Sequence, residues 1–338
     1  MAERKVTSLD VAARAGVSQS AVSRVFTPGA SVSKKMAARV REAADALGYR
    51  PNVLARSLIT GRSRIIGLVV SYLDNQFYPD ALERLSNALQ EKGYHILIFM
   101  AQGSGHAVEP VIDELLDYQV DGIVTASVGM SDELAGRCAV AGIPVVLFNR
   151  GQEDARLSQV TSDNVGGARK IAEFLVAGGH KRIGHITGWM GSSTGRDREA
   201  GFRAGLKDAG LEPVAVMDGC FERETASSVA REMVEQHQVD AIFVGNDHMA
   251  FAVMDTLRYD LKLRVPDDVS VVGYDDVPLA AWPSYDLTTL RQPSGKMVEL
   301  TVETLLEQIE SGDAAPRKIA IDGPLIVRGS ARVPKGWA

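Results

Sequence analysis

Apolar residues in the first part of the chain recur at intervals of mostly three to four, which is the spacing of one face of an α-helix. Gly16 divides this stretch at a sharp turn that favours a residue without a Cβ, so the pattern predicts two short helices. Ser33 can cap a third helix, expected from about Lys34 to Leu47 and closed by Gly48. The expected core of this unit is Leu9, Val17, Val22, Val25, Met36, Val40 and Leu47.

From Ile65 onward, short β-rich apolar runs alternate with segments of helical spacing. The first half predicts strands at 65–71, 94–101, 121–127, 143–150 and 159–163, with helices at 82–93, 110–119 and 133–142. The second half predicts strands at 181–188, 240–246 and 268–276, with helices at 167–179, 198–210, 224–236 and 248–260. Because the runs are apolar at successive positions, these strands are expected to be buried on both faces.

Repeated β–α units of this kind predict an α/β fold with two lobes, each a doubly wound parallel sheet covered by helices. Late segments at 287–290, 294–310, 318–323 and 325–328 suggest that the chain crosses again between the lobes. The expected domains are a three-helix headpiece with a helix-turn-helix motif at 1–50, a hinge helix or linker at 51–64 and a body at 65–338. Within the body, we expect an N-lobe of about 65–162 plus 293–324 and a C-lobe of about 163–290 plus 325–338.

The second predicted helix leaves a polar face outward. Thr7 can cap the first helix, and Ser18 starts the second. The outward residues of the second helix are Gln19, Ser20, Ser23 and Arg24. Such side chains can contact base edges or phosphates. A small helical bundle with an ordinary solvated face would look the same at this level, so that interpretation stays open.

Charge distribution favours nucleic acid. Residues 1–64 carry twelve Lys or Arg against four acids, a net charge of +8, whereas the whole chain is −6 and the remainder is therefore −14. A basic head on an acidic body is typical of a DNA-binding domain joined to another domain.

The headpiece resembles that of the LacI family of bacterial transcriptional regulators. The motifs that carry the resemblance are Thr7-x-x-Asp10-Val11-Ala12, Ala15-Gly16-Val17-Ser18, Val22-Ser23-Arg24-Val25, Val32-Ser33 and Gly48-Tyr49-x-Pro51-Asn52. The resemblance extends to the bilobal body, which is similar to periplasmic sugar-binding proteins. It implies a ligand-responsive regulator, expected to be a repressor, that binds double-stranded DNA at a pseudo-palindromic operator.

The resemblance also implies DNA-contacting positions. Gln19, Ser20 and Arg24 match positions of the recognition helix in the major groove, and Leu58 matches a hinge-helix Leu inserted in the minor groove. The expected DNA-binding residues are Thr7, Ser18, Gln19, Ser20, Ser23, Arg24, Asn52, Ala55, Arg56 and Leu58. Leu58 could instead be an apolar anchor against the body. Linker 51–64 is expected to become helical only when DNA and a second subunit hold it.

Polar and aromatic residues follow the predicted strands, where α/β sheets bind ligands. Among them, the resemblance implies effector contacts for Phe77, Tyr78, Arg150, Asp163, Thr194, Arg198, Phe221, Asn246 and Asp275. Arg198 and Asp275, both expected at strand ends, form the central pair. This set suits a sugar, a sugar acid or a phosphosugar. Phe77 could instead be core, and Asp163, Asn246 and Asp247 could instead cap helices.

The sequence offers little support for an enzyme. Asp275 and Asp276 are paired carboxylates, but the six His show no HExxH or other metal-ligand spacing. Two Gly-rich stretches lack the phosphate-binding motifs, and no cofactor is expected. Cys138 and Cys220 are expected to be reduced thiols. The alternatives are a dinucleotide-dependent enzyme and a small-molecule-binding protein without a specific DNA target, such as one associated with transport.

Hydropathy predicts a cytoplasmic protein. No apolar run approaches the roughly 18 residues of a membrane span, and the basic N-terminus precedes no apolar signal-peptide core. The chain stops at Trp337-Ala338, where tetrameric members of the family carry a further leucine-repeat helix, so a homodimer is expected.

Overall fold

The computed structural model describes residues 6–27, 30–50, 62–101, 109–312 and 314–337. It divides into two compact units, residues 1–63 and residues 64–338. Four expected DNA-contacting residues lie outside the described residues: Asn52, Ala55, Arg56 and Leu58. Their expected roles therefore stay predictions.

The first unit contains three short helices, α1 (Ser8–Ala15), α2 (Gln19–Val25) and α3 (Lys34–Leu47). Gly16 and Gly48 end α1 and α3 in the left-handed conformation, with φ of 60° and 65°. The buried core consists of Val11, Ala12, Ala15, Val22, Val25, Val40, Ala43 and Ala44, with Val17, Met36 and Leu47 partly buried against it. The core prediction was wrong for Leu9, which is 59% exposed because the inward face of α1 carries Val11, Ala12 and Ala15.

The second unit contains two six-stranded sheets. The N-lobe sheet has the order β11-β5-β4-β3-β1-β2 and is entirely parallel. Its strands are β1 (Ile65–Val70), β2 (His95–Met100), β3 (Gly122–Ala126), β4 (Val145–Phe148), β5 (Ser158–Ser162) and β11 (Lys318–Ile321). Its helices are α5 (Phe77–Glu91), α6 (Glu109–Asp117), α7 (Asp132–Val140) and α12 (Ser294–Ser311).

The C-lobe sheet has the order β12-β10-β9-β8-β6-β7 and is parallel except for the antiparallel edge strand β12. Its strands are β6 (Ile183–Thr187), β7 (Ala215–Asp218), β8 (Ala241–Val244), β9 (Ser270–Asp275), β10 (Thr288–Arg291) and β12 (Leu325–Ile326). Its helices are α8 (Asn164–Ala177), α9 (Ser193–Asp208), α10 (Arg223–His237) and α11 (Asp247–Asp255), the last continued by a π-helical turn at Thr256–Asp260. A short 3₁₀ helix spans Pro278–Ala281.

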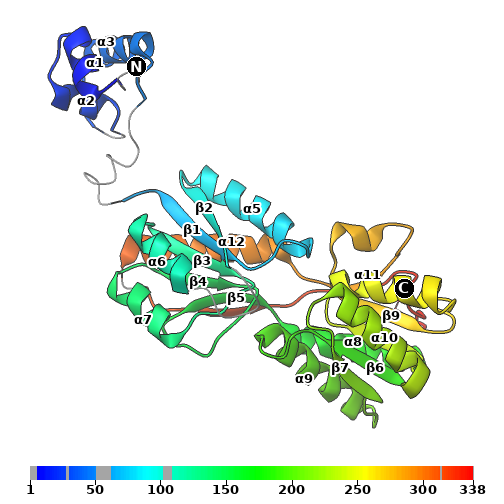
Figure 1. The fold of residues 1–338 in the computed structure, drawn as a ribbon. Helices are drawn as coiled ribbons and strands as arrows, with labels where there is room; N and C mark the ends of the chain where they lie inside the picture. Colours follow the sequence, from blue (N-terminus) through cyan, green and yellow to red (C-terminus); the bar gives the residue numbers. More distant parts are fainter. Residues whose placement is uncertain (1–5, 28–29, 51–61, 102–108, 313, 338) are drawn as a thin grey trace. The chain divides into compact units, whose positions relative to one another are not determined.

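The two lobes are not consecutive in the sequence. The chain leaves the first sheet after β5, returns to it after β10 through α12 and β11, and leaves it again to form β12. In Figure 1, orange α12 accordingly lies among the cyan and green elements of the N-lobe, where it packs against α5. The segments that connect the sheets place residues of both lobes near one another.

Three expectations about the elements are corrected. Strand β2 is not buried on both faces, because it is the edge strand and leaves Ile98 and Met100 51% and 46% exposed. Helices α5 and α9 each begin five residues before their predicted starts at 82 and 198. The first turn of α5 contains Pro79, which is tolerated there, and continues the buried face with Phe77 and Tyr78. The first turn of α9 is the polar stretch 193–197, which lacks apolar spacing. Among the described residues, no helix is long and apolar enough to cross a membrane.

Candidate DNA-binding surface and effector site

Helix α2 presents a polar face to solvent. Ser18 caps the helix, because its Oγ accepts a hydrogen bond from the Ala21 N–H at 3.2 Å. Gln19 Nε2 donates to Ser8 Oγ at 3.0 Å, which ties the start of α2 to α1. The outward residues Gln19, Ser20, Ser23 and Arg24 are all exposed, as the sequence predicts. These side chains can meet a DNA groove without rearrangement of the small core beneath them.

The capping expected at Thr7 is also present. Asp10 accepts hydrogen bonds from the Thr7 backbone N–H at 2.8 Å and from its hydroxyl at 2.7 Å. A carboxylate in the first turn stabilises a helix through its dipole and its free N–H groups. Arg39 of α3 donates to the Ala15 carbonyl at 2.5 Å and so fixes the end of α1. Thr7 therefore stabilises the start of α1, in addition to any contact that it makes with DNA.

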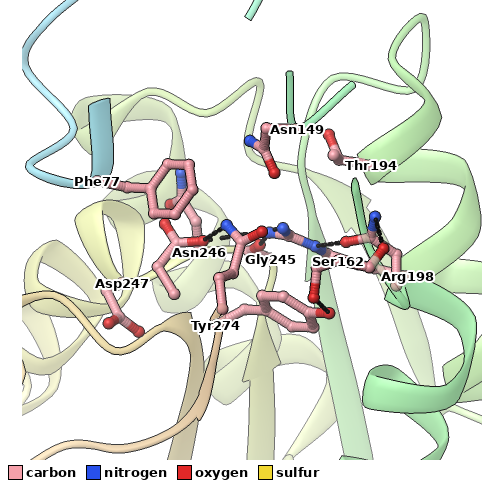
Figure 2. A network of polar contacts seen from close by, with 12 residues as sticks. Phe77, Asn149, Ser162, Thr194, Arg198, Gly245, Asn246, Asp247 and Tyr274 are labelled. Carbon is pink, nitrogen blue, oxygen red and sulfur yellow. Dashed lines mark hydrogen bonds and ion pairs between the residues drawn. The ribbon is translucent and has the colours of Figure 1, made fainter. Parts of the chain in front are cut away.

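Arg198 is the centre of a buried polar network in the C-lobe. Its Nε donates to Asn164 Oδ1 at 2.8 Å, and its Nη1 donates to the Gly245 carbonyl at 2.5 Å. The guanidinium carbon lies 3.6 Å from the centre of the Tyr274 ring, a cation–π contact. Figure 2 shows the Arg198 side chain passing over Tyr274 toward Gly245. Arg198 lies in helix α9, as the helix predicted at 198–210 implies, and the further expectation that it lies at a strand end was wrong.

Asp275 ends strand β9 and joins this network. Its Oδ1 lies 3.8 Å from Arg198 Nη2, and the two side chains are 2% and 3% exposed. Gln292 Nε2 donates to Asp275 Oδ1 at 2.7 Å, and Asn75 Nδ2 of the N-lobe donates to Oδ2 at 3.1 Å. Burial raises the pKa of Asp275, although Arg198 and these hydrogen bonds oppose the shift. The carboxyl thus links the C-lobe sheet to the N-lobe loop after β1.

Asp247 is a second buried carboxyl. From the sequence it was expected either among the ligand-facing polar residues after a strand or as a helix cap. Asn246 is the cap of α11, and its Oδ1 accepts from the Met249 N–H at 2.9 Å. Asp247 is fully buried, accepts from the Val277 N–H at 3.0 Å, and lies 2.6 Å from the Thr289 hydroxyl. Burial, with the charge of Asp275 nearby, raises the pKa of Asp247 to about 8. No sequence pattern indicated this burial.

Phe77 and Tyr78 lie in the first turn of α5 and are both buried. Phe77 stacks on Phe148 with 6.1 Å between ring centres, so it belongs to the N-lobe core. The Tyr78 hydroxyl accepts from Asn149 Nδ2 at 3.1 Å. Figure 2 shows Phe77 and Asn149 near the network around Arg198. The core interpretation of Phe77 agrees with this packing.

Arg150 and Phe221 meet between the lobes. The Arg150 guanidinium lies 5.5 Å from the centre of the Phe221 ring, and its Nη1 donates to the Ser127 carbonyl at 2.5 Å. Next to this contact, the Gly151 N–H donates to Ser193 Oγ at 2.9 Å. Loops after β4 and β7 and the first turn of α9 therefore approach one another here.

The remaining side chains that were predicted to contact the effector cap helices or lie beside a helix cap. Asp163 Oδ1 accepts from the Gly166 N–H at 2.9 Å and caps α8, as Asn246 caps α11. The Thr194 hydroxyl lies 3.1 Å from that of Ser192, the cap of α9. Helix caps at strand ends and ligand-binding residues share the same residue types, which is why sequence alone left both interpretations open.

Two cavities adjoin these residues. One of about 600 Å³ is lined by Arg150 and by other residues of both lobes, and one of about 350 Å³ is lined by Phe77 and Asp275 among others. The structure does not place the other predicted effector residues on the walls of either cavity. Among the described residues, no cluster of three or more His, Cys, Asp or Glu could hold a metal ion.

Comparison with known proteins identifies the family. Residues 7–52 match the family described as bacterial regulatory proteins, lacI family, and residues 172–331 match a periplasmic binding protein-like domain. The ribose operon repressor of Escherichia coli (strain K12) is 31% identical over 331 residues, which cover 96% of this chain and 99% of that protein. The chain belongs to the LacI family.

Further relatives agree with this assignment. The HTH-type transcriptional regulator CelR of Thermobifida fusca is 33% identical over 337 residues, covering 97% of this chain and 98% of CelR. The solved CelR–cellobiose complex has a TM-score of 0.73 at 32% identity, covering 96% of this chain and 100% of that chain. The lac repressor dimer bound to operator and ONPF has a TM-score of 0.87 at 27% identity, covering 97% and 99%.

The family resemblance drawn from the headpiece motifs is thereby confirmed, as is the predicted fold class. This LacI-family chain is a DNA-binding transcriptional regulator with an effector-binding body. The relatives named above are transcriptional regulators and not enzymes.

Proposed function

We propose that this chain is a repressor that binds a pseudo-palindromic operator as a homodimer and responds to a small polar effector. The observation that carries the proposal is the exposed polar face of α2 on a basic unit, in a chain whose body holds a buried polar network touched by both lobes. Two such headpieces would read two half-sites, which explains the expected operator symmetry.

The relatives support both halves of the proposal. A solved relative is a dimer bound to an operator, and another is a complex with cellobiose. By analogy, we assign DNA contacts to Gln19, Ser20, Ser23 and Arg24. Linker residues Asn52, Ala55, Arg56 and Leu58 belong to the same proposal through the family resemblance, as do Thr7 and Ser18.

We assign the effector-binding site to the space between the two lobes. The nine residues of this part of the proposal are Phe77, Tyr78, Arg150, Asp163, Thr194, Arg198, Phe221, Asn246 and Asp275. An effector that binds one relative orientation of the lobes better than another shifts the protein toward that orientation. Operator affinity then changes by the coupling free energy, about 1–3 kcal/mol or roughly 5–150-fold.

Selection of binding sites from randomised DNA duplexes tests the DNA half of the proposal. The expected result is an enriched pseudo-palindromic site that a dimer occupies. Arg24→Ala should lose about 1–3 kcal/mol of discrimination against random DNA, the contribution of one good base contact. Equal losses on selected and random duplexes would show that Arg24 contacts only phosphate, and a failure to enrich any site would overturn the proposal.

A further inference from the structure

The larger cavity lies between the two lobes. Its walls come from the loop after β3 (128–131), the loop after β4 (150–153), and the segment from Trp189 to Ser193 with Arg196 of α9. The Gly151–Ser193 hydrogen bond links the lobes beside it. At about 600 Å³, its volume is within the range of sites for small organic ligands. Changes in the separation of the lobes therefore change the shape of this cavity.

Positive charge dominates the walls of this cavity. Arg150 and Arg196 both line it, and Glu153 is the one acidic side chain among its lining residues. Arg196 Nη1 donates to the carbonyls of Met190 and Gly191 at 3.2 and 2.9 Å. As far as the structure describes the chain, neither guanidinium forms an ion pair within 4 Å. Carbonyl oxygens satisfy N–H groups but carry no full negative charge, so these hydrogen bonds do not neutralise the two guanidinium groups. Arg196 also interacts electrostatically with the carboxyl of its neighbour Asp197.

Arg150 also has an unused donor. Within the described residues, its Nε is buried and makes no hydrogen bond. A buried donor without an acceptor costs free energy and requires an explanation. Its Nη1 is held by the Ser127 carbonyl and its planar group lies over Phe221, so the side chain is fixed in place. A bound anion beside the guanidinium would neutralise its charge, and one of its oxygens would satisfy Nε once the atoms that cover Nε move aside.

Trp189 provides an apolar wall for the same cavity. Ser192 donates to the Trp189 carbonyl through its backbone N–H at 3.0 Å and its hydroxyl at 2.8 Å, which fixes this turn. A Cβ at Gly191 would overlap the indole, so the ring lies directly against the glycine. Half-buried aromatic rings with polar groups beside them suit the mixed surface of a sugar ring.

We propose that the effector is an anionic saccharide, whose carboxylate or phosphate binds Arg150 and Arg196 and whose ring packs against Trp189. This inference rests on the proposed function, because it assumes that the ligand between the lobes is the effector. It narrows the effector from polar sugars in general to those with a negative group. It also assigns Arg196 and Trp189, which the family resemblance did not.

Calorimetric titration of the full chain with matched probes tests the proposal. The neutral sugars galactose, lactose and glucose are compared with the carboxylates galacturonate, lactobionate and gluconate, respectively. Glucose is also compared with glucose 6-phosphate, so that binding of a carboxylate and binding of a phosphate are measured separately. In at least one pair the anionic member should bind about tenfold or more tightly than the neutral member. Arg150→Gln should remove that preference, and added salt should weaken it.

Arg264→Gln is the matched control, because it removes the same charge from an exposed side chain paired with Asp267 and Asp268. It should leave the preference intact. Ligand-induced change of Trp fluorescence should disappear in Trp189→Phe and persist in Trp282→Phe, whose indole is 59% exposed. Thermal unfolding of Arg150→Gln, compared with the unchanged chain, shows whether the variant is folded.

Three outcomes would overturn the inference. The first is that no anionic probe binds in a way that depends on Arg150, and the second is that the neutral member of every pair binds as tightly as the anionic one. The third is that Arg150→Gln and Arg264→Gln change the preference for the anionic probe equally. A neutral sugar that binds and alters operator affinity would reject the anionic effector but leave the proposed regulator in place. An anionic probe that binds through Arg150 and leaves operator affinity unchanged would establish the anion site and reject its role as effector site.

Discussion

Buried ionisable side chains are the unusual residues of the body. Arg198 and Asp275 lie 3.8 Å apart with less than a twentieth of either side chain exposed, and Asp247 is fully buried nearby. A buried charge is tolerated only where hydrogen bonds and an opposite charge replace water. Arg198 and Asp275 meet this condition, whereas Asp247 meets it by holding a proton, since its pKa is raised to about 8.

Asp247→Asn should change how stability depends on pH. The folded chain keeps the Asp247 proton up to about pH 8, whereas the unfolded chain releases it near pH 4. The proton therefore stabilises the fold at low pH, and this contribution is lost as pH rises from about 4 to about 8. Asn is isosteric with the protonated form and has no proton to lose.

Denaturant unfolding at several pH values measures this effect. The free energy of unfolding of Asp247→Asn minus that of the unchanged chain should rise with pH, by at most about 1.4 kcal/mol per pH unit. Asp267→Asn, at a side chain that is 63% exposed, is the control and should show little slope. A flat difference for Asp247→Asn would mean that Asp247 is ionised in the folded chain.

Asp275→Asn should remove the effector response. The amide keeps the size of the carboxyl but leaves Arg198 without its buried negative partner. Asp275→Ala additionally removes the acceptors of Asn75 and Gln292, and should destabilise the body by about 3–5 kcal/mol. Operator titration with and without effector measures the first effect, and chemical unfolding the second. A normal response in Asp275→Asn would show that the effector does not depend on this carboxylate.

Helices α8 and α9 illustrate how small residues determine packing between elements. A Cβ at Gly201 of α9 would overlap the Val165 backbone of α8, and one at Gly205 would crowd Ala172. Close approach of these two helices therefore depends on glycine at both positions. The same pair carries Asn164 and Arg198, so the spacing of the helices also sets the geometry of the buried network.

Gly201→Ala should destabilise the C-lobe by about 1–3 kcal/mol, because overpacking forces the backbones apart. Gly295→Ala is the matched control, since Gly295 is in helix α12 and a Cβ there meets no atom within 4 Å. That control should be neutral or slightly stabilising. Urea unfolding of both variants measures the difference. Equal stability of the two would show that α8 and α9 can separate without cost.

Element positions followed from the sequence where apolar spacing was unbroken. Helix α3 spans Lys34–Leu47 as predicted, because Ser33 caps it and Gly48 closes it. The start of α9 could not be predicted from apolar spacing, because its first turn, 193–197, is polar. The start of α5 was missed for another reason: Phe77 and Tyr78 were assigned to the loop after the first strand as ligand-contacting residues, although they continue the apolar spacing of the helix. The sequence indicated Arg198 and Asp275 as a pair, but the burial of Asp247 and the contact of Arg150 with Phe221 depend on elements distant in the chain.

At the scale of the whole molecule, the chain joins a basic unit of residues 1–63 to a body with a polar network and a cationic cavity. We propose that effector binding in the body changes operator binding by the headpiece. The coupling is reciprocal: binding of the operator must change the affinity for the effector by the same factor by which the effector changes the affinity for the operator.

The most direct test is a salt-controlled titration of the purified chain against fragmented DNA from its source genome, with and without the neutral and anionic sugars named above. We expect enrichment of one pseudo-palindromic site, and a change of roughly 5–150-fold in the affinity of the chain for that site when one of these compounds is present. Binding that is uniform across fragments, disappears at moderate salt and is unaffected by every compound would contradict the account, because it is what non-specific phosphate contacts alone produce.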